Sequence, residues 1–130
     1  MSKKVLIVDD DPDVRLFSAT VVEESGYTPI EAANGEEGLK IVKKDRPDLV
    51  ILDVLMPKQS GIRLYRELKT DKALIGIPVI MLSGVAKRTF LRSQKALTEF
   101  GDKPVPEPEN YLEKPIEPEE LAREIKKLLG

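Results

Sequence analysis

The chain has 130 residues, of which 41% are hydrophobic and 34% are charged, and its 23 acidic and 21 basic side chains leave a formal net charge of −2. This length allows one domain with a substantial core, and this composition excludes general disorder and a small disulfide scaffold. The balanced charge provides no basic field for binding nucleic acid. Cysteine and histidine are absent, which excludes thiolate chemistry and histidine-ligated metal sites. No apolar run approaches the length of a membrane span, and the N-terminus lacks a signal-peptide core, so we expect a cytoplasmic protein.

Short apolar runs and helical patterns alternate along the chain. Residues 5–8, 49–52 and 77–82 form continuous apolar runs, which are typical of strands buried on both faces of a parallel sheet. Between and after these runs, apolar residues recur at helical spacing. In chain order, the expected elements are a strand at 3–8, a helix at 12–25, a strand at 28–32, a helix at 35–45, a strand at 48–53, a helix at 60–70, a strand at 77–83, a helix at 86–100, a strand at 110–113 and a helix at 118–129.

This alternation predicts an α/β fold of the (βα)5 type, in which a doubly wound parallel five-stranded sheet has the flavodoxin-like order 2-1-3-4-5. We expect a single domain over residues 1–130. The order places the strand at 28–32 on an edge of the sheet, where Pro29 is tolerated. Asp11 and Asn34 are expected to cap the helices that follow them. The proline-rich connection at about 98–110 is expected to be an extended loop inside the domain.

Acidic side chains follow two predicted strands that are neighbours in this order. Asp9 and Asp10 follow the first strand, and Asp53 ends the third. Ligands of open α/β sheets bind beyond the carboxyl ends of the strands, where the strand order switches. Two like charges ~4 Å apart repel by about 4 kcal/mol at an effective dielectric constant of 20, so these carboxylates need a compensating cation. In a chain without histidine or cysteine the ligands are oxygens, which favour a hard cation, Mg²⁺ above all.

Two more polar side chains are predicted at the same edge. Ser83 ends the fourth strand and Lys114 ends the fifth. The hydroxyl can hydrogen-bond a phosphoryl oxygen, and the ammonium can neutralise negative charge that develops there. The other basic residues of the middle helices are expected on solvated faces, and they are Lys40, Lys43, Lys44, Arg46, Arg63, Arg66, Lys69 and Lys72.

In this constellation the chain resembles the receiver domain of bacterial two-component response regulators, over essentially its whole length. The resemblance is carried by four segments in order. These are VLIVDDDPDVR with its acidic pair, DLVILDVLMPKQSG with its phosphoacceptor Asp, IPVIMLSG with its switch Ser, and YLEKPIEPEEL with its aromatic residue and Lys-Pro pair. Each segment alone is moderately specific, whereas all four at successive strand ends are very specific.

The resemblance implies roles for the acidic residues. Asp53 would be the nucleophile that takes the phosphoryl group. Asp10 would bind Mg²⁺ directly and Asp9 largely through water, together with Asp53 and the backbone carbonyl of Leu55. Mn²⁺ would be an acceptable substitute for Mg²⁺.

The resemblance also implies which residues contact the phosphoryl group and respond to it. Lys114 and Ser83 would contact the phosphoryl group. Ser83 and Tyr111 would form the switch, with Tyr111 changing rotamer as Ser83 moves. The peptide bond between Lys114 and Pro115 is commonly cis in this family, and a cis X–Pro bond is usually a kept feature.

A member of this family would accept its phosphoryl group from a sensor histidine kinase or a His-phosphotransfer protein. It would then control a downstream protein, or an output domain of its own, through the surface formed by residues 86–100, 110–113 and 118–129. Such a chain is a phosphoacceptor switch with self-phosphorylation and self-dephosphorylation, not a turnover enzyme. The same surface is a candidate for homodimerisation, whereas binding to nucleic acid or a membrane is not expected.

Three alternatives have specific signatures. A Mg²⁺-dependent phosphatase of the haloacid dehalogenase type would need an acid two residues after the nucleophile, where this chain has Leu55. A flavodoxin-like flavin carrier would need a phosphate-binding loop after the first strand, where three acids stand here. A receiver-like interaction module that works without phosphorylation is the third alternative.

One departure from the family pattern is the long interval from Ser83 to Lys114, which favours altered partner choice.

Overall fold

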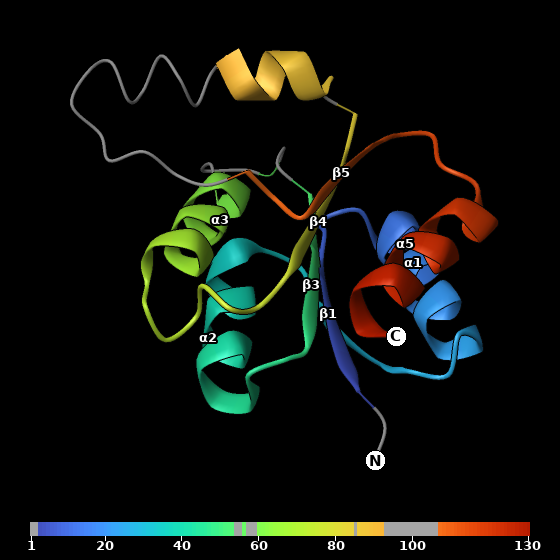
Figure 1. Ribbon diagram of the computed structural model, residues 1–130, viewed down its shortest axis with the longest axis horizontal. Coiled ribbons are helices and arrows are strands. Elements are labelled where there is room, and N and C mark those ends of the chain that lie inside the picture. Colours follow the sequence, from blue (N-terminus) through green and yellow to red (C-terminus); the bar gives the residue numbers. More distant parts are fainter. Residues whose placement is uncertain (1–2, 54–55, 57–59, 85, 93–106) are drawn as a thin grey trace.

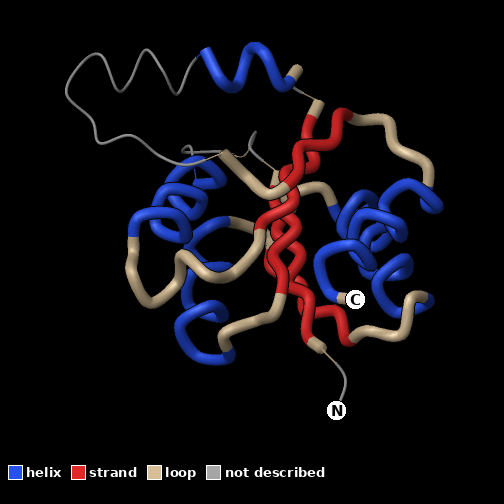
Figure 2. The backbone as a smooth tube through the Cα atoms, in the orientation of Figure 1, coloured by secondary structure: helices blue, strands red, loops and turns tan. Residues whose placement is uncertain are grey.

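The protein is described by a computed structural model that covers residues 3–53, 56, 60–84, 86–92 and 107–130. Its centre is a five-stranded sheet with the order β2-β1-β3-β4-β5, in which every neighbouring pair is parallel (Figures 1 and 2). The strands are β1 (Lys4–Val8), β2 (Thr28–Ala32), β3 (Leu49–Leu52), β4 (Val79–Ser83) and β5 (Asn110–Glu113). The helices are α1 (Pro12–Glu24), α2 (Gly35–Asp45), α3 (Ser60–Thr70) and α5 (Pro118–Leu129). Residues 87–92 are also helical.

Helices cover both faces of the sheet because its strands are apolar on both faces. Along β1, Val5 and Ile7 belong to one core cluster, with residues of α1 and α5, whereas Leu6 and Val8 belong to the other, with residues of α2 and α3. This alternation follows from the two-residue period of a strand. Figure 1 shows the resulting three layers, with α1 and α5 on one side and α2 and α3 on the other.

The predicted (βα)5 sheet and its order are confirmed, and element boundaries differ by only one or two residues. The largest difference is at β4, which was expected from residue 77 and begins at Val79. The N–H of Ile77 donates to the carbonyl of Leu74 in a turn, and Pro78 has no N–H to donate. The first N–H after this proline belongs to Val79, and it donates to Oε1 of Glu109 at 2.7 Å. The second half of the predicted helix at 86–100, and residues 98–106 of the predicted loop, lie outside the described residues.

Local sequence signals explain where the helices start and stop. Asp11 caps α1 by accepting from the N–H of Asp13 at 2.9 Å, and Asn34 caps α2 by accepting from the N–H of Glu37 at 2.8 Å, both as predicted. After α1 the chain turns at Gly26, whose φ of 92° suits glycine.

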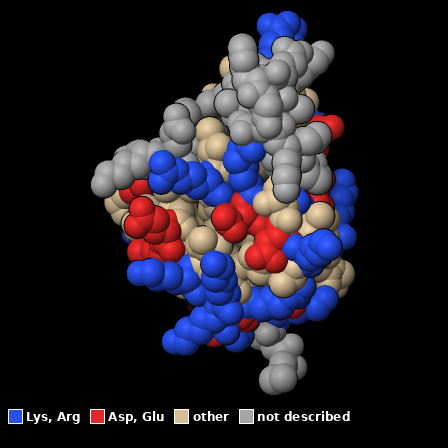
Figure 3. Space-filling view, turned by 90° about the vertical axis from the view of Figure 1, so that its left-hand side faces the viewer, with Lys and Arg blue, Asp and Glu red and all other residues tan. Residues whose placement is uncertain are grey.

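The expectation for one basic residue is wrong. Lys69 is 3% exposed rather than solvated, and its ammonium is paired with the carboxylate of Glu109, which directly precedes β5. Arg66 is only half-buried and so fits the prediction in part. The remaining residues of the set are exposed as predicted, and they are Lys40, Lys43, Lys44, Arg46, Arg63 and Lys72. Figure 3 shows basic side chains spread among acidic ones over the side of the molecule formed by α2 and α3. Lys69 lies one helical turn after the buried Tyr65, so it is on the core-facing side of α3.

Gly35 allows α2 and α3 to approach closely at their starts. A Cβ atom at this position would lie 2.0 Å from the backbone oxygen of Ser60, while the Gly35 N–H donates to the Ser60 hydroxyl at 3.1 Å. We predict that Gly35→Ala lowers the free energy of unfolding by about 1–3 kcal/mol, because a backbone atom cannot move aside cheaply. Gly76→Ala is the control, since its Cβ would meet only Arg46 at an ordinary 3.7 Å. Urea denaturation of both variants measures the effect, and equal stabilities would contradict it.

Candidate functional site

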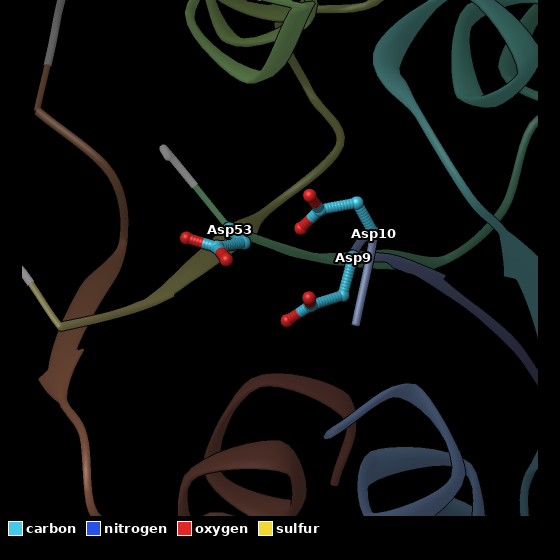
Figure 4. Close-up of side chains that lie close together, drawn as sticks. All are labelled: Asp9, Asp10 and Asp53. Atoms are coloured by element: carbon cyan, nitrogen blue, oxygen red, sulfur yellow. The ribbon is translucent and has the colours of Figure 1, made fainter. Parts of the chain in front are cut away.

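Three carboxylates meet at the carboxyl edge of the sheet. Asp9 and Asp10 directly follow β1, and Asp53 directly follows the neighbouring β3. The parallel ladder continues past the strand end, since the Asp53 N–H donates to the carbonyl of Val8 at 3.0 Å. One oxygen from each carboxylate lies within 4.8 Å of the others, and Figure 4 shows Asp9 and Asp10 extending toward the side of Asp53. The predicted acidic cluster is therefore assembled.

Burial makes this cluster electrostatically demanding. Asp9 is 3% exposed and Asp53 is 6% exposed, whereas Asp10 is exposed. Burial raises the pKa of Asp9, while the Asp11 N–H, which donates to its Oδ1 at 2.9 Å, and the nearby Lys114 act to lower it. Buried carboxylates that repel one another need cations to compensate them.

Lys114 supplies part of that compensation. Its Nζ lies 3.2 Å from Asp9 Oδ2 and 3.3 Å from Asp53 Oδ2, so it bridges the two strands. Burial alone would lower the pKa of Lys114, but the charges of Asp53 and Asp9 outweigh this effect and raise it, which keeps the ammonium protonated. The backbone holds this position, because the Lys114 N–H donates to the carbonyl of Ser83 at 2.8 Å. The peptide bond between Lys114 and Pro115 is cis.

Ser83 and Tyr111 lie on the neighbouring strands β4 and β5. Ser83 is fully buried at the end of β4, and Tyr111 is largely buried on β5. Burial raises the pKa of Tyr111, and a hydrogen bond with the Ser83 side chain acts in the opposite direction. The Tyr111 ring also packs against the ring of Phe90, with centroids 5.4 Å apart. Leu55, expected to offer its carbonyl, lies outside the described residues.

The donor set fits a hard divalent cation. All three clustered side chains offer carboxylate oxygens, and the chain contains no histidine or cysteine that would favour a softer metal. Asp10 is the exposed member, so part of an ion's coordination sphere would face solvent. Mg²⁺ commonly keeps several waters, which suits such a partly open arrangement.

One supporting residue was not found from the sequence. Arg15 donates from Nη1 to the backbone carbonyl of Asp9 at 2.7 Å, and its Nε lies 3.4 Å from Oε1 of Glu31 on β2. It thereby ties the acidic loop to the edge strand. The available signal was its position, because Arg15 lies one turn after the cap Asp11 and can reach back over the start of α1.

Among the described residues, no helix is long and apolar enough to cross a membrane.

Comparisons with known proteins agree on one family. The sequence model described as "Response regulator receiver domain" matches residues 5–126. The phosphate regulon transcriptional regulatory protein PhoB of Pseudomonas aeruginosa is 35% identical over 129 residues, covering 99% of this chain and 52% of that protein. The sporulation initiation phosphotransferase F of Bacillus subtilis is 33% identical over 132 residues, covering 99% of this chain and 95% of that protein. The chain spans about half the length of PhoB and the other transcriptional regulators that it matches.

Solved structures share the fold. The chemotaxis response regulator CheY4 of Vibrio cholerae has a TM-score of 0.80 and 27% identity, over 98% of this chain and 99% of that one. A structure titled as the BeF3-activated DrrB receiver domain has a TM-score of 0.76 and 25% identity, over 99% of this chain and 98% of that one. Both likenesses extend over the whole sheet and the helices on both of its faces.

Proposed function

Since the chain belongs to the response regulator receiver domain family, whose members are phosphoacceptor switches rather than turnover enzymes, we propose that its phosphoacceptor is Asp53. The observation that carries this proposal is the bridging contact of Lys114 with Asp53 and Asp9. Asp53 has a carboxylate beside a fixed ammonium and two further acids, which is an arrangement suited to phosphoryl transfer.

The same acids would hold the metal ion. We assign Asp9, Asp10 and Asp53 to Mg²⁺, with Mn²⁺ as a substitute and the Leu55 carbonyl as a further ligand. The support is the oxygen-only donor set and its spacing within 4.8 Å. A bound Mg²⁺ supplies positive charge for the phosphoryl oxygens.

The chain's own groups then have defined parts in the transfer. An oxygen of Asp53 attacks the phosphorus of the donor, a bond from that oxygen to phosphorus forms, and the bond from phosphorus to the donor atom breaks with its electron pair. Lys114 neutralises negative charge on the transferring group, and Ser83 donates a hydrogen bond to a phosphoryl oxygen. The product carries roughly −2 charge and offers more acceptor oxygens than the free carboxylate.

The switch would follow from those new acceptors. Ser83 is hydrogen-bonded to Tyr111 in the unphosphorylated chain, so a Ser83 hydroxyl that turns to the phosphoryl group changes the position of Tyr111. The surface that responds would comprise residues 87–92, β5 and α5.

Partners follow from the family. A sensor histidine kinase or a His-phosphotransfer protein would be the donor, and the name phosphotransferase on the Bacillus subtilis relative supports membership of such a relay. The output would be a downstream protein or a further domain of a longer chain, as the half-length match to transcriptional regulators suggests. A homodimer through the responding surface, a cytoplasmic location and the lack of nucleic-acid binding by this chain complete the proposal.

Mass spectrometry of the intact protein with acetyl phosphate tests this function. One added phosphoryl group is expected with Mg²⁺, and none is expected after chelation of the metal. The clustered carboxylates repel the negatively charged phosphate unless a bound cation compensates their charge. An adduct that forms equally well without a divalent ion would contradict the proposed site. No adduct with acetyl phosphate and no complex with beryllofluoride would instead favour a phosphorylation-independent interaction module.

Lys114 provides a prediction for the transfer rate. We expect Lys114→Met to slow phosphorylation by acetyl phosphate about 10²–10³-fold, the usual loss when one fixed donor to a developing charge is removed. Lys126→Met on α5 is the control, since it removes the same charge away from the site. A time course of adduct formation measures both rates, and a Lys114→Met rate equal to that of the control would contradict the role of Lys114.

A further inference from the structure

The helix at 87–92 begins after Ala86, whose side chain cannot cap it. The Phe90 N–H donates to the carbonyl of Ala86 at 3.0 Å, which identifies Ala86 as the residue at the N-cap position. Alanine has no side-chain oxygen, so its side chain cannot accept from the N–H groups of the first turn. Such a helix start is poorly satisfied unless another part of the chain provides an acceptor.

That acceptor comes from β5. The N–H of Lys87 donates to Oε1 of Glu113 at 2.9 Å, across 26 residues of sequence. A carboxylate at this end of a helix is also favoured by the helix dipole. Glu113 directly precedes Lys114, whose backbone N–H is bonded to Ser83 and whose ammonium contacts Asp53. The cap is therefore joined covalently to the phosphoryl site.

A second contact joins the same helix to the same face of β5. Tyr111 and Glu113 are two residues apart on the strand, so their side chains leave the same face of the sheet. Phe90 packs between Tyr111 and Tyr65 of α3, with centroid distances of 5.4 and 5.7 Å, and is 3% exposed. The first turn of the helix is thus held by two neighbouring side chains of β5.

We propose that Glu113 is a positioning residue that couples the phosphoryl site to the start of the helix at 87–92. This inference rests on the proposed function of Asp53. When Lys114 and Ser83 adjust to the phosphoryl group, Glu113 and Tyr111 move with their strand, and the cap on Lys87 is made or lost in step. The described part of this helix responds because the Lys87 N–H at its start is capped by Glu113 of β5.

Hydrogen exchange of the unphosphorylated protein tests the cap first. In Glu113→Ala, the first-turn amides of residues 87–90 are expected to exchange about 5- to 30-fold faster than in the wild type, the effect of a lost cap. Glu113→Gln keeps an acceptor oxygen and is expected to restore most of the protection. Glu107→Ala is the matched control, because Glu107 pairs with the Lys87 ammonium at 3.9 Å and not with its backbone. Equal exchange in Glu113→Ala and Glu107→Ala would overturn the proposal.

Beryllofluoride with Mg²⁺ tests the coupling. The wild type and Glu113→Gln are expected to change exchange at residues 87–92 when beryllofluoride binds, whereas Glu113→Ala is expected to bind it, judged by protection around Asp53, and lose the change at the helix. An unchanged helix response in Glu113→Ala would overturn the coupling alone. Absence of any beryllofluoride effect around Asp53 in the wild type would overturn the proposed function, and the coupling with it, while the result on the cap would stand.

Discussion

Replacing Asp53 by asparagine is expected to abolish phosphorylation by acetyl phosphate. The amide has the shape of the carboxylate, but its oxygen is a poor nucleophile, and the loss of charge weakens the metal site as well. The variant should still fold, because removing one of three clustered carboxylates relieves repulsion. Intact-protein mass spectrometry reports the adduct, and circular dichroism reports the fold.

Asp11→Asn is the matched control for this change. It removes the same charge from the same edge of the sheet, but Asp11 acts as the cap of α1, and asparagine keeps the oxygen that accepts from Asp13. We expect wild-type phosphorylation from this variant. A Mg²⁺-dependent adduct that persists in Asp53→Asn, or that is lost equally in both variants, would contradict the assignment of Asp53.

The second large effect concerns the ion pair between Lys69 of α3 and Glu109, which directly precedes β5. Glu109 accepts from the ammonium of Lys69 and from the N–H of Val79 at 2.7 Å. We predict that Glu109→Ala lowers the free energy of unfolding by about 3–5 kcal/mol, because a buried ammonium then has lost its counter-charge. Lys69→Met should lower the free energy of unfolding much less, because it removes the buried charge itself. The side chain of Glu109 is 32% exposed, so its carboxylate can still bind water and the Val79 N–H.

Urea denaturation of both variants measures this asymmetry. Glu107→Ala is the control for a nearby carboxylate, because its pair with Lys87 is exposed on both sides and is expected to contribute little. A Lys69→Met variant that is as unstable as Glu109→Ala would contradict the account. The double variant should fall between the two single variants, because no buried ammonium remains in it but the Val79 N–H has lost its acceptor.

The sheet was predictable because its strands are encoded locally. The continuous apolar runs at 5–8 and 49–52 fit a strand buried on both faces, and Pro29 is tolerated near the start of the edge strand β2. The acidic site was predictable for a related reason, since in a parallel sheet residues that end neighbouring strands must meet. Asp9 and Asp53 needed only the strand order to be brought together.

The supporting contacts were not predictable because they join distant segments through single side chains. Charge suggested that Lys69 was solvated, and its partner Glu109 lies 40 residues away. The cap on Lys87 comes from Glu113, and nothing in the segment before Lys87 indicates it. Such contacts depend on the register of β5 against β4, which the local sequence patterns do not specify.

Chemical trapping of the phosphorylated residue tests the central claim most directly. Borohydride reduces an acyl phosphate to a primary alcohol, so a phosphorylated aspartate becomes homoserine. After phosphorylation with acetyl phosphate and Mg²⁺, reduction and proteolysis, peptide mass spectrometry should find homoserine at position 53 and unmodified aspartate at positions 9 and 10. Homoserine at position 9 or 10, or an adduct that resists borohydride, would contradict Asp53 as the phosphoacceptor.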